Sequence, residues 1–528
     1  GGIVKCWGYG VCSSDLGGIV KCWGYGVDDR LGQVTDAWWS WPPPQYVVDA
    51  RMFDVTNVWL STPSQRETLV SQPDAYQAPD SGIHPITVEV DERSVFQSID
   101  GFGAALTDAS AWLIEERMDW RLTTGLLRIL FDPADGLGLS IVRLPMGASE
   151  FYTGTAYTYD DNGGTPDPDL TNFSIAHDEQ YIIPILQQIK TINPAVKIIA
   201  APWSAPAWMK DSGRLEGGKL KPEYYAVYAD YFLRFVQAYA AHGLPIYAVS
   251  LQNEPEHEST SYPTMLFPAD DAARFVADYL GPLFEANDIQ TQIWIWDHNW
   301  DNPEYPLSVL SNPAARGYIQ ATAFHAYTGT AASQTTVHDA WPHKDIQFTE
   351  QSGGEWDTDF GSNLKWGVQN LLIGATRNWA KSVLRWNIAL NTENGPHQGG
   401  CNNCLGLVTI DESARNFTYE NDYYLLGHLS RFVRPGAVRI ASSHFPGIIE
   451  SVAFKNPDGS KVLLVLNPAT AETDFKVRYN GKSFVYRLAG GAVVTFVWQG
   501  DDLPVPLSNL AGVVRDGQGQ PITGVTVG

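Results

Sequence analysis

The chain has 528 residues, and its 35 basic against 59 acidic side chains give a formal net charge of −24. This charge repels nucleic-acid phosphates and anionic membrane surfaces, so we expect no nucleic-acid partner and favour neutral or cationic ones. No apolar run reaches the roughly eighteen residues of a membrane span, and the length predicts two or three domains or one large barrel with an attachment.

The amino-terminal segment contains a verbatim repeat, because residues 1–11 recur unchanged at residues 17–27. Its C-W-G-Y-G motif resembles a blade fragment of the regulator-of-chromosome-condensation type of β-propeller, and one blade cannot bury its own faces. The insert V-C-S-S-D-L can be encoded by the tail of a common sequencing adapter. We therefore interpret residues 1–33 as a propeller-like repeat of artefactual origin in a metagenomic gene.

No signal peptide is recognisable at the start of the chain, because a basic segment followed by an apolar one is lacking. We still expect a secreted protein of bacterial origin, whose true amino terminus is unknown. Residues 34–54 are predicted to be a linker, since three consecutive prolines remove backbone donors and favour extended chain.

Short runs rich in β-branched and aromatic residues occur on both sides of a long central region. Residues 55–97 and 428–500 are predicted to form one antiparallel β-sandwich from such runs. Residues 505–528 alternate valines around D-G-Q-G-Q-P, a hairpin signal, and we expect them to begin a further, truncated β-sandwich module.

The central region, residues 98–427, alternates short apolar strands with amphipathic stretches, which predicts a (β/α)8 barrel. Gly243 is placed to end the third helical stretch. The predicted strands are 98–106, 139–147, 196–204, 247–255, 291–299, 321–327, 345–352 and 382–390. The clearest helical stretches are 112–131, 178–189, 222–243 and 363–380.

Polar side chains follow the strand ends, where the active sites of such barrels lie. Glu254 and Glu350 close the fourth and seventh strands and can converge on one bond across the barrel mouth. Two carboxyl groups suffice to hydrolyse a glycosidic bond, so no metal or cofactor is expected. Either glutamate alone could instead be a salt-bridged rim residue. The other strand-end residues are Asp108, Arg143, Trp203, Asn253, Asp297, His298, His325, Tyr327, Trp386 and Asn387.

Seven motifs make the chain similar to glycoside hydrolase family 30 over about residues 55–500. The resemblance implies a retaining β-glycosidase with a barrel and a sandwich. It also implies that Glu254 is the acid/base and Glu350 the nucleophile. The motifs are GFGAALTDAS, IVRLPMGASEFYTG, APWSAPAWMK, SLQNEPEH, FHAYTGT, FTEQSGG and LRWNIALNTENGP.

The resemblance also implies a site for the first sugar. Asp108 would accept hydrogen bonds from sugar hydroxyls, or else be a helix N-cap. Asn253 would bond the 2-hydroxyl, and Arg143 would keep the carboxylates ionised. Trp203 and Trp386 would contact the sugar, or else pack in the rim. His325 and Tyr327 would bond the nucleophile or the sugar, with a structural histidine as the alternative, and His298 and Asn387 would support the site.

Substrate choice stays open within the family. H-N-W-D-N and I-G-A-x-x-N-W look most like the endo-β-1,6-glucanase branch, with a β-glucan as the partner. The alternatives are an exo-acting β-glucosidase or glucosylceramidase-like enzyme and a catalytically silent carbohydrate-binding or adhesion protein. Xylan is disfavoured, because glucuronate recognition needs a cationic site. Cys401 and Cys404 could form a loop disulfide, free thiols or part of a metal site; their loop, residues 398–406, is expected near the site.

Overall fold

The computed structural model describes residues 10–14, 20–24 and 54–500. The predicted linker before residue 54 and the predicted module at 505–528 lie outside these residues. Most of the propeller-like segment, residues 1–33, also lies outside them. Within that segment, β1 (Gly10–Ser14) and β2 (Val20–Gly24) pair antiparallel.

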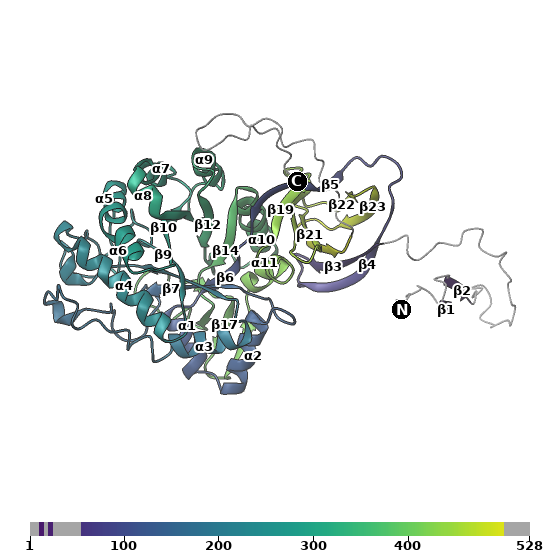
Figure 1. Ribbon diagram of the computed structural model, residues 1–528. Coiled ribbons are helices and arrows are strands. Elements are labelled where there is room, and N and C mark those ends of the chain that lie inside the picture. The colour runs from purple at the N-terminus through teal and green to yellow at the C-terminus, as the bar shows by residue number, and fades with distance from the viewer. Residues whose placement is uncertain (1–9, 15–19, 25–53, 501–528) are drawn as a thin grey trace, which may run out of the picture.

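A closed barrel of eight parallel strands forms the larger part of the protein, on the left in Figure 1. Every predicted barrel strand is confirmed, and the last pairs with the first through Ser382 and Gly101. Buried side chains from six of the strands form a cluster in the interior, and all of them except Trp294 are small or branched. The strands are β6 (Gly101–Ala105), β7 (Ile141–Met146), β8 (Lys197–Pro202), β9 (Ile246–Ser250), β10 (Gln292–Asn299), β11 (Ile319–His325), β12 (Asp345–Glu350) and β14 (Ala380–Arg385).

Helices surround this barrel. The predicted stretch 112–131 is two helices rather than one, because Asp119 accepts hydrogen bonds from Arg121 N and Leu122 N and so starts a new helix. Gly243 adopts φ +75° just after the third long helix, as predicted. The helices are α1 (Asp108–Glu116), α2 (Trp120–Phe131), α3 (Ile182–Ile192), α4 (Tyr225–Ala241), α5 (Ala269–Phe275), α6 (Gly281–Ala286), α7 (Glu304–Ser311), α8 (Pro313–Tyr318), α9 (Ala332–Ala340), α10 (Phe360–Gly367) and α11 (Asn421–Ser430).

A second β-structure lies beside the barrel, on the right in Figure 1. Its two layers are joined at their edges, and its neighbouring strands are antiparallel except for one parallel pair, β5 with β22. The sequence patterns did not reveal β4 or β19. The strands are β3 (Asp54–Ser61), β4 (Val70–Pro79), β5 (Thr87–Ser98), β19 (Val438–Ser442), β20 (Glu450–Lys455), β21 (Lys461–Leu466), β22 (Thr473–Tyr479), β23 (Lys482–Leu488) and β24 (Val493–Trp498).

Helix α11 connects the two parts through a buried histidine. His428 is fully buried and bonds the hydroxyl of Ser61 on β3 at 2.8 Å and that of Thr495 on β24 at 2.9 Å. Burial lowers the pKa of His428 to about 3. A neutral imidazole therefore lies at the contact between the barrel and the sandwich.

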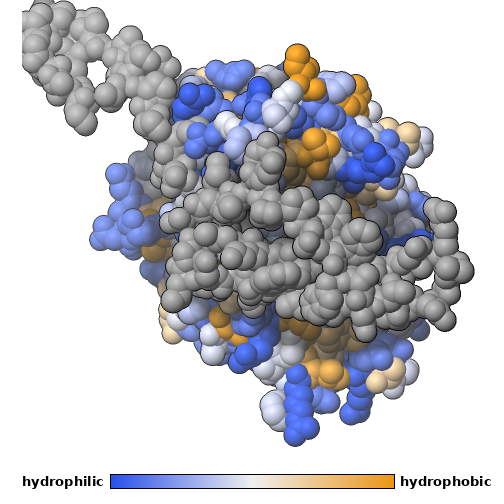
Figure 2. Space-filling model, turned by 90° about the vertical axis from the view of Figure 1, so that its right-hand side faces the viewer, coloured by the Kyte–Doolittle hydropathy of each residue, from blue (hydrophilic) through white to orange (hydrophobic). Residues whose placement is uncertain are grey.

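The remaining features of the fold are the surface of the sandwich and the other short strands. On the sandwich end shown in Figure 2, hydrophilic residues dominate the described surface and hydrophobic ones lie in small separate groups. Among the described residues, no helix has the length and apolarity that crossing a bilayer requires. The remaining strands are β13 (Gly353–Gly354), β15 (Ala389–Asn391), β16 (Cys404–Leu405), β17 (Val408–Asp411) and β18 (Asn416–Tyr419).

Candidate active site

The carboxyl ends of the barrel strands surround a pocket of about 430 Å³. Both glutamates line it. Of the other predicted residues, Asp108, Arg143, His325 and Asn387 are buried and do not line the pocket. The lining residues are Glu150, Trp203, Asn253, Glu254, His257, Tyr262, His298, Asn299, Tyr327, Glu350, Trp356, Trp386, Gly400, Cys401 and Cys404.

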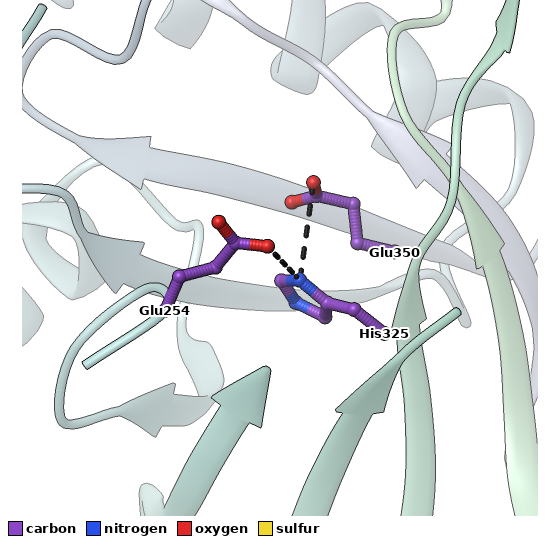
Figure 3. A group of neighbouring side chains, drawn as sticks. All are labelled: Glu254, His325 and Glu350. Atoms are coloured by element: carbon purple, nitrogen blue, oxygen red, sulfur yellow. Dashed lines mark hydrogen bonds and ion pairs between the residues drawn. The ribbon is translucent and has the colours of Figure 1, made fainter. Parts of the chain in front are cut away.

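Glu254 and Glu350 face one another across this pocket, with the His325 ring beside both (Figure 3). One side-chain oxygen of each glutamate and one ring nitrogen of His325 all lie within 4.8 Å of one another. Retaining glycosidases hold their two carboxyl groups about 5 Å apart, whereas inverting enzymes need roughly 6.5–9.5 Å. The separation therefore fits direct attack by a carboxylate on the sugar.

Two donors hold the Glu350 carboxylate. The Arg143 guanidinium donates to Oε2, and the Tyr327 hydroxyl donates to Oε1 at 2.9 Å. Arg143 also donates to Asn253 Oδ1 at 2.7 Å and to Asp297 Oδ2 at 3.0 Å. A buried guanidinium and a phenol on opposite oxygens fix the orientation of this carboxylate.

His325 joins Glu254 to Asp297. Its Nδ1 lies 3.0 Å from Glu254 Oε1, and its Nε2 lies 3.1 Å from Asp297 Oδ1. Burial favours the neutral ring, but the charge of Glu350 and the hydrogen bonds to Asp297 and Glu254 raise the pKa of His325 to about 9. The raised pKa favours a protonated ring that donates to both carboxylates.

The acid/base candidate departs from the simple expectation of a raised pKa. Burial raises the pKa of Glu254, yet the hydrogen bond from His325 and the charge of that ring bring it below its ordinary value. These two opposite shifts favour a protonated His325 ring that is hydrogen-bonded to an ionised Glu254. Glu254 also adopts φ +47°, a left-handed conformation that aims its side chain at the pocket.

Two tryptophans form the inner wall. Trp203 and Trp386 stack with ring centroids 5.1 Å apart and planes at 18°, and each is at most 2% exposed. The Arg143 guanidinium lies 5.0 Å from the Trp203 centroid and 5.5 Å from that of Trp386. Both rings line the pocket while they pack against each other, so their packing is confirmed and their contact with a sugar stays a prediction.

Glu150, in the loop after β7, is a pocket residue that the sequence patterns did not single out. Trp386 Nε1 donates to its Oε1 at 3.0 Å, while the buried Oε2 has no partner. Burial and the charge of Glu350 raise the pKa of Glu150 to about 8. A carboxyl that is neutral at pH 7 can donate a hydrogen bond into the pocket. The signal that could have revealed it is an acidic residue within the apolar stretch S-E-F, next to a strand end.

Asp108 is not the helix N-cap that was the alternative, and its contact with a sugar stays a prediction. Thr107, not Asp108, is the N-cap of α1. The Asp108 carboxylate accepts from Thr153 N at 2.8 Å and lies 2.8 Å from His177 Nε2, and the residue is not part of the pocket lining. It therefore anchors the loop after β7 in this structure.

The two remaining supporting candidates lie close to the pocket. Asn387 is fully buried at φ +60° and accepts from Thr107 Oγ1 at 2.9 Å. His298 lines the pocket with its buried Nδ1 unpaired, and burial lowers its pKa. His298 is therefore a neutral ring with a free nitrogen at the pocket wall.

The loop after β14 covers one side of the pocket. Cys401 and Cys404 are joined by a disulfide, with an S–S distance of 2.03 Å, which excludes the thiol and metal-ligand alternatives for this structure. Cys404 packs with the two wall tryptophans. A Cβ on Gly400 would lie 2.6 Å from Glu150 Cγ, so only glycine lets the loop approach this closely.

Comparisons with known proteins agree on one family. The family model for the glycosyl hydrolase family 30 TIM-barrel domain matches residues 99–433, and that for the family 30 β-sandwich domain matches residues 436–496. An endo-1,6-β-D-glucanase of Trichoderma harzianum is 33% identical over 70% of this chain and 78% of its own length. The lysosomal acid glucosylceramidase of Mus musculus is 30% identical over 76% of this chain and 82% of its own.

The solved structures give the same result. A structure titled as an endo-β1,6-glucanase has a TM-score of 0.78 and 32% identity, and covers 85% of this chain and all of its own. SrfJ from Salmonella typhimurium has a TM-score of 0.80 and 28% identity over the same shares. Barrel and sandwich are thus both common to these proteins.

Proposed function

The chain belongs to glycosyl hydrolase family 30. We propose that it is a retaining glycosidase that cleaves internal linkages of β-1,6-glucan. The observation that carries the chemistry is the close approach of Glu254 and Glu350 in one pocket. The endo-1,6-β-glucanases among its relatives, at 33–34% identity, support the substrate.

In the first step Glu350 attacks the anomeric carbon while Glu254 protonates the departing glycosidic oxygen. Arg143 and Tyr327 hold the attacking carboxylate in one orientation. The bond from the anomeric carbon to the leaving oxygen breaks as the bond to Glu350 forms. The product is a covalent glycosyl-enzyme and a shortened glucan that carries the proton.

The proton for this step comes from the His325–Glu254 pair. His325 Nδ1 lies 3.0 Å from Glu254 Oε1, so a shift along this hydrogen bond converts the carboxylate into the acid. Asp297 fixes the orientation of the ring through its other nitrogen. The pair therefore stores one proton next to the leaving group without needing a strongly raised glutamate pKa.

In the second step Glu254, now a carboxylate, takes a proton from water as the water attacks the glycosyl-enzyme. Glu350 leaves, and the sugar keeps its β configuration. Asn253 lies next to Glu254, where it would bond the 2-hydroxyl. Glu150, neutral near pH 7, would donate to another sugar hydroxyl.

The test is to incubate the protein with a β-1,6-glucan and measure new reducing ends. We expect cleavage by wild type, a loss with Glu350→Gln, and little change with Glu355→Gln, an exposed acid five residues further on. Early products of several lengths would support internal cleavage. If the wild type cleaves xylan or aryl β-glucosides and leaves β-1,6-glucan intact, the proposed substrate is wrong.

An exo-acting, glucosylceramidase-like activity is the second candidate, because a lysosomal acid glucosylceramidase is 30% identical over 82% of its length. Release of single glucose units from the first time point would favour it. A catalytically silent glucan-binding protein would bind β-1,6-glucan and generate no reducing ends. Secretion is part of our proposal, because a disulfide beside the pocket suits an oxidising compartment.

A further inference from the structure

Trp356 is an exposed aromatic ring at the mouth of the pocket. It is 53% exposed, and it lines the same pocket as Glu254 and Glu350. Tyr327 is also exposed at this mouth, but its hydroxyl already bonds Glu350. Leaving a large apolar ring in water is common for scattered surface residues, but here the ring adjoins a reactive pocket.

The backbone around Trp356 is held from two sides. Gly353 and Gly354 pair antiparallel with Leu405 and Cys404 of the disulfide loop, and Glu355 N donates to Asn403 O at 2.8 Å. The disulfide therefore braces the segment that carries the tryptophan.

The position of the Trp356 ring is also fixed by its packing. A Cβ on Gly354 would lie 1.9 Å from Trp356 Cζ3, so the six-membered ring occupies the space that any larger residue would need. Gly353 N donates to Asp422 Oδ2 at 3.2 Å, and Arg385 forms an ion pair with that aspartate. Trp356 is therefore a preorganised ring on a rigid support, although its surface faces water.

The pocket has a closed inner end and an open outer end. Trp203 and Trp386 line the inner end and are at most 2% exposed, whereas Tyr327 and Trp356 are exposed at the outer end. The sugar that reacts has to lie at this inner end, against Glu350. The departing sugar has to leave through the outer end, where Trp356 lies.

We propose that Trp356 is the stacking platform for the leaving-group glucosyl unit, and that it thereby selects oligomeric over monomeric substrates. The apolar face of a glucose ring suits a flat aromatic ring. Because the support of Trp356 is rigid, the side chain loses little conformational entropy when a sugar binds. The proposal rests on the proposed glucanase activity, since it concerns the second sugar of the same substrate.

The experiment compares three substrates that fill the pocket differently. β-Glucosyl fluoride occupies the reacting-sugar position alone, gentiobiosyl fluoride adds a sugar on the far side, and gentiotetraose also places sugars on the leaving-group side. With Trp356→Ala we expect kcat/KM for gentiotetraose to fall at least about tenfold while that for both fluorides stays within about twofold. Trp366→Ala, which removes a 40% exposed ring on α10 outside the pocket, should change none of them.

The outcomes separate this proposal from the glucanase proposal. A loss of kcat/KM in Trp356→Ala with gentiobiosyl fluoride alone would place Trp356 on the far side of the reacting sugar. Equal losses or no loss with all three substrates would overturn the stacking proposal. If the wild type cleaves β-glucosyl fluoride and a β-glucotetraose of another linkage, the proposed β-1,6 specificity is wrong. The variants would then be compared on that tetraose. Wild type that cleaves the fluoride and no tetraose would overturn both proposals.

Discussion

One carboxylate oxygen of Glu254 lies within 4.8 Å of one carboxylate oxygen of Glu350, although two strands, β10 and β11, separate β9 from β12 in the barrel. A gap of this size leaves no place for a water molecule between the sugar and the second carboxylate, as inversion would require. The geometry therefore supports the proposed double displacement with a covalent intermediate.

Replacing the acid/base should slow turnover in a way that a small anion repairs. Glu254→Gln should lower kcat on β-1,6-glucan by about 10²–10⁴-fold, the usual contribution of general acid–base catalysis. With 2,4-dinitrophenyl β-glucoside, whose leaving group needs no proton, azide should restore turnover and give β-glucosyl azide by NMR. Glu256→Gln, an exposed neighbour, is the control. An α-azide product would instead make Glu254 the nucleophile.

The Asp297–His325 hydrogen bond should set the alkaline limit of activity. The shared proton is present below the His325 pKa of about 9 and is lost as the pH rises through it. Asp297→Asn removes a charge that raises this pKa, so the alkaline fall of kcat/KM should move to lower pH. Asp301→Asn, an exposed aspartate four residues on, should leave the profile in place. An unmoved profile in Asp297→Asn would show that His325 does not hold the catalytic proton.

Glu150 should act as a neutral hydrogen-bond donor. Its pKa of about 8 makes it protonated at pH 6, so Glu150→Gln keeps both charge and donor and should retain most activity there. Glu150→Leu leaves a sugar hydroxyl unpaired and should lose at least about tenfold in kcat/KM. Equal losses in the two variants at pH 6 would mean that the ionised form is the functional one.

The buried imidazole between barrel and sandwich should make the protein sensitive to acid. His428 has a folded pKa of about 3, so below its unfolded value the unfolded chain binds a proton that the folded chain does not. Stability should fall from this source by up to about 1.4 kcal/mol per pH unit below pH 6.5.

His428→Gln can still bond Ser61 and Thr495 and should lack this contribution. Urea unfolding of wild type and variant between pH 7 and pH 4.5 measures the difference, and His84→Gln, a partly exposed histidine near β5, is the control. Parallel pH profiles for wild type and His428→Gln would contradict the prediction.

Much of the fold was predictable because its periodicities are strong and regular. Each barrel strand was predicted from a short apolar run that ends in polar residues. Glu254 and Glu350 were singled out because they stand at two of those ends. β4 escaped prediction, because Pro73 and Asp74 within it are residues that strands usually avoid. The break between α1 and α2 depends on one capping carboxylate inside a continuous amphipathic pattern.

The site was harder to predict where it depends on contacts between loops. Asp108 has the sequence signature of a sugar ligand or a helix cap, but Thr153 and His177 take up its carboxylate. Glu150 and Trp356 lie in loops beyond their strands, and only the disulfide loop folding over them brings both to the pocket. Such placement has no periodic signal in the sequence.

Trapping the intermediate tests the central claim most directly. The 2-fluorine of 2-deoxy-2-fluoro-β-glucosyl fluoride slows both steps, while the good leaving group lets the first proceed, so the glycosyl-enzyme accumulates. Peptide mass spectrometry should find one fluoroglucosyl group on Glu350, and Glu350→Gln should remain unlabelled. A label on Glu254, or an unlabelled wild type that releases α-configured product from β-1,6-glucan, would contradict the mechanism.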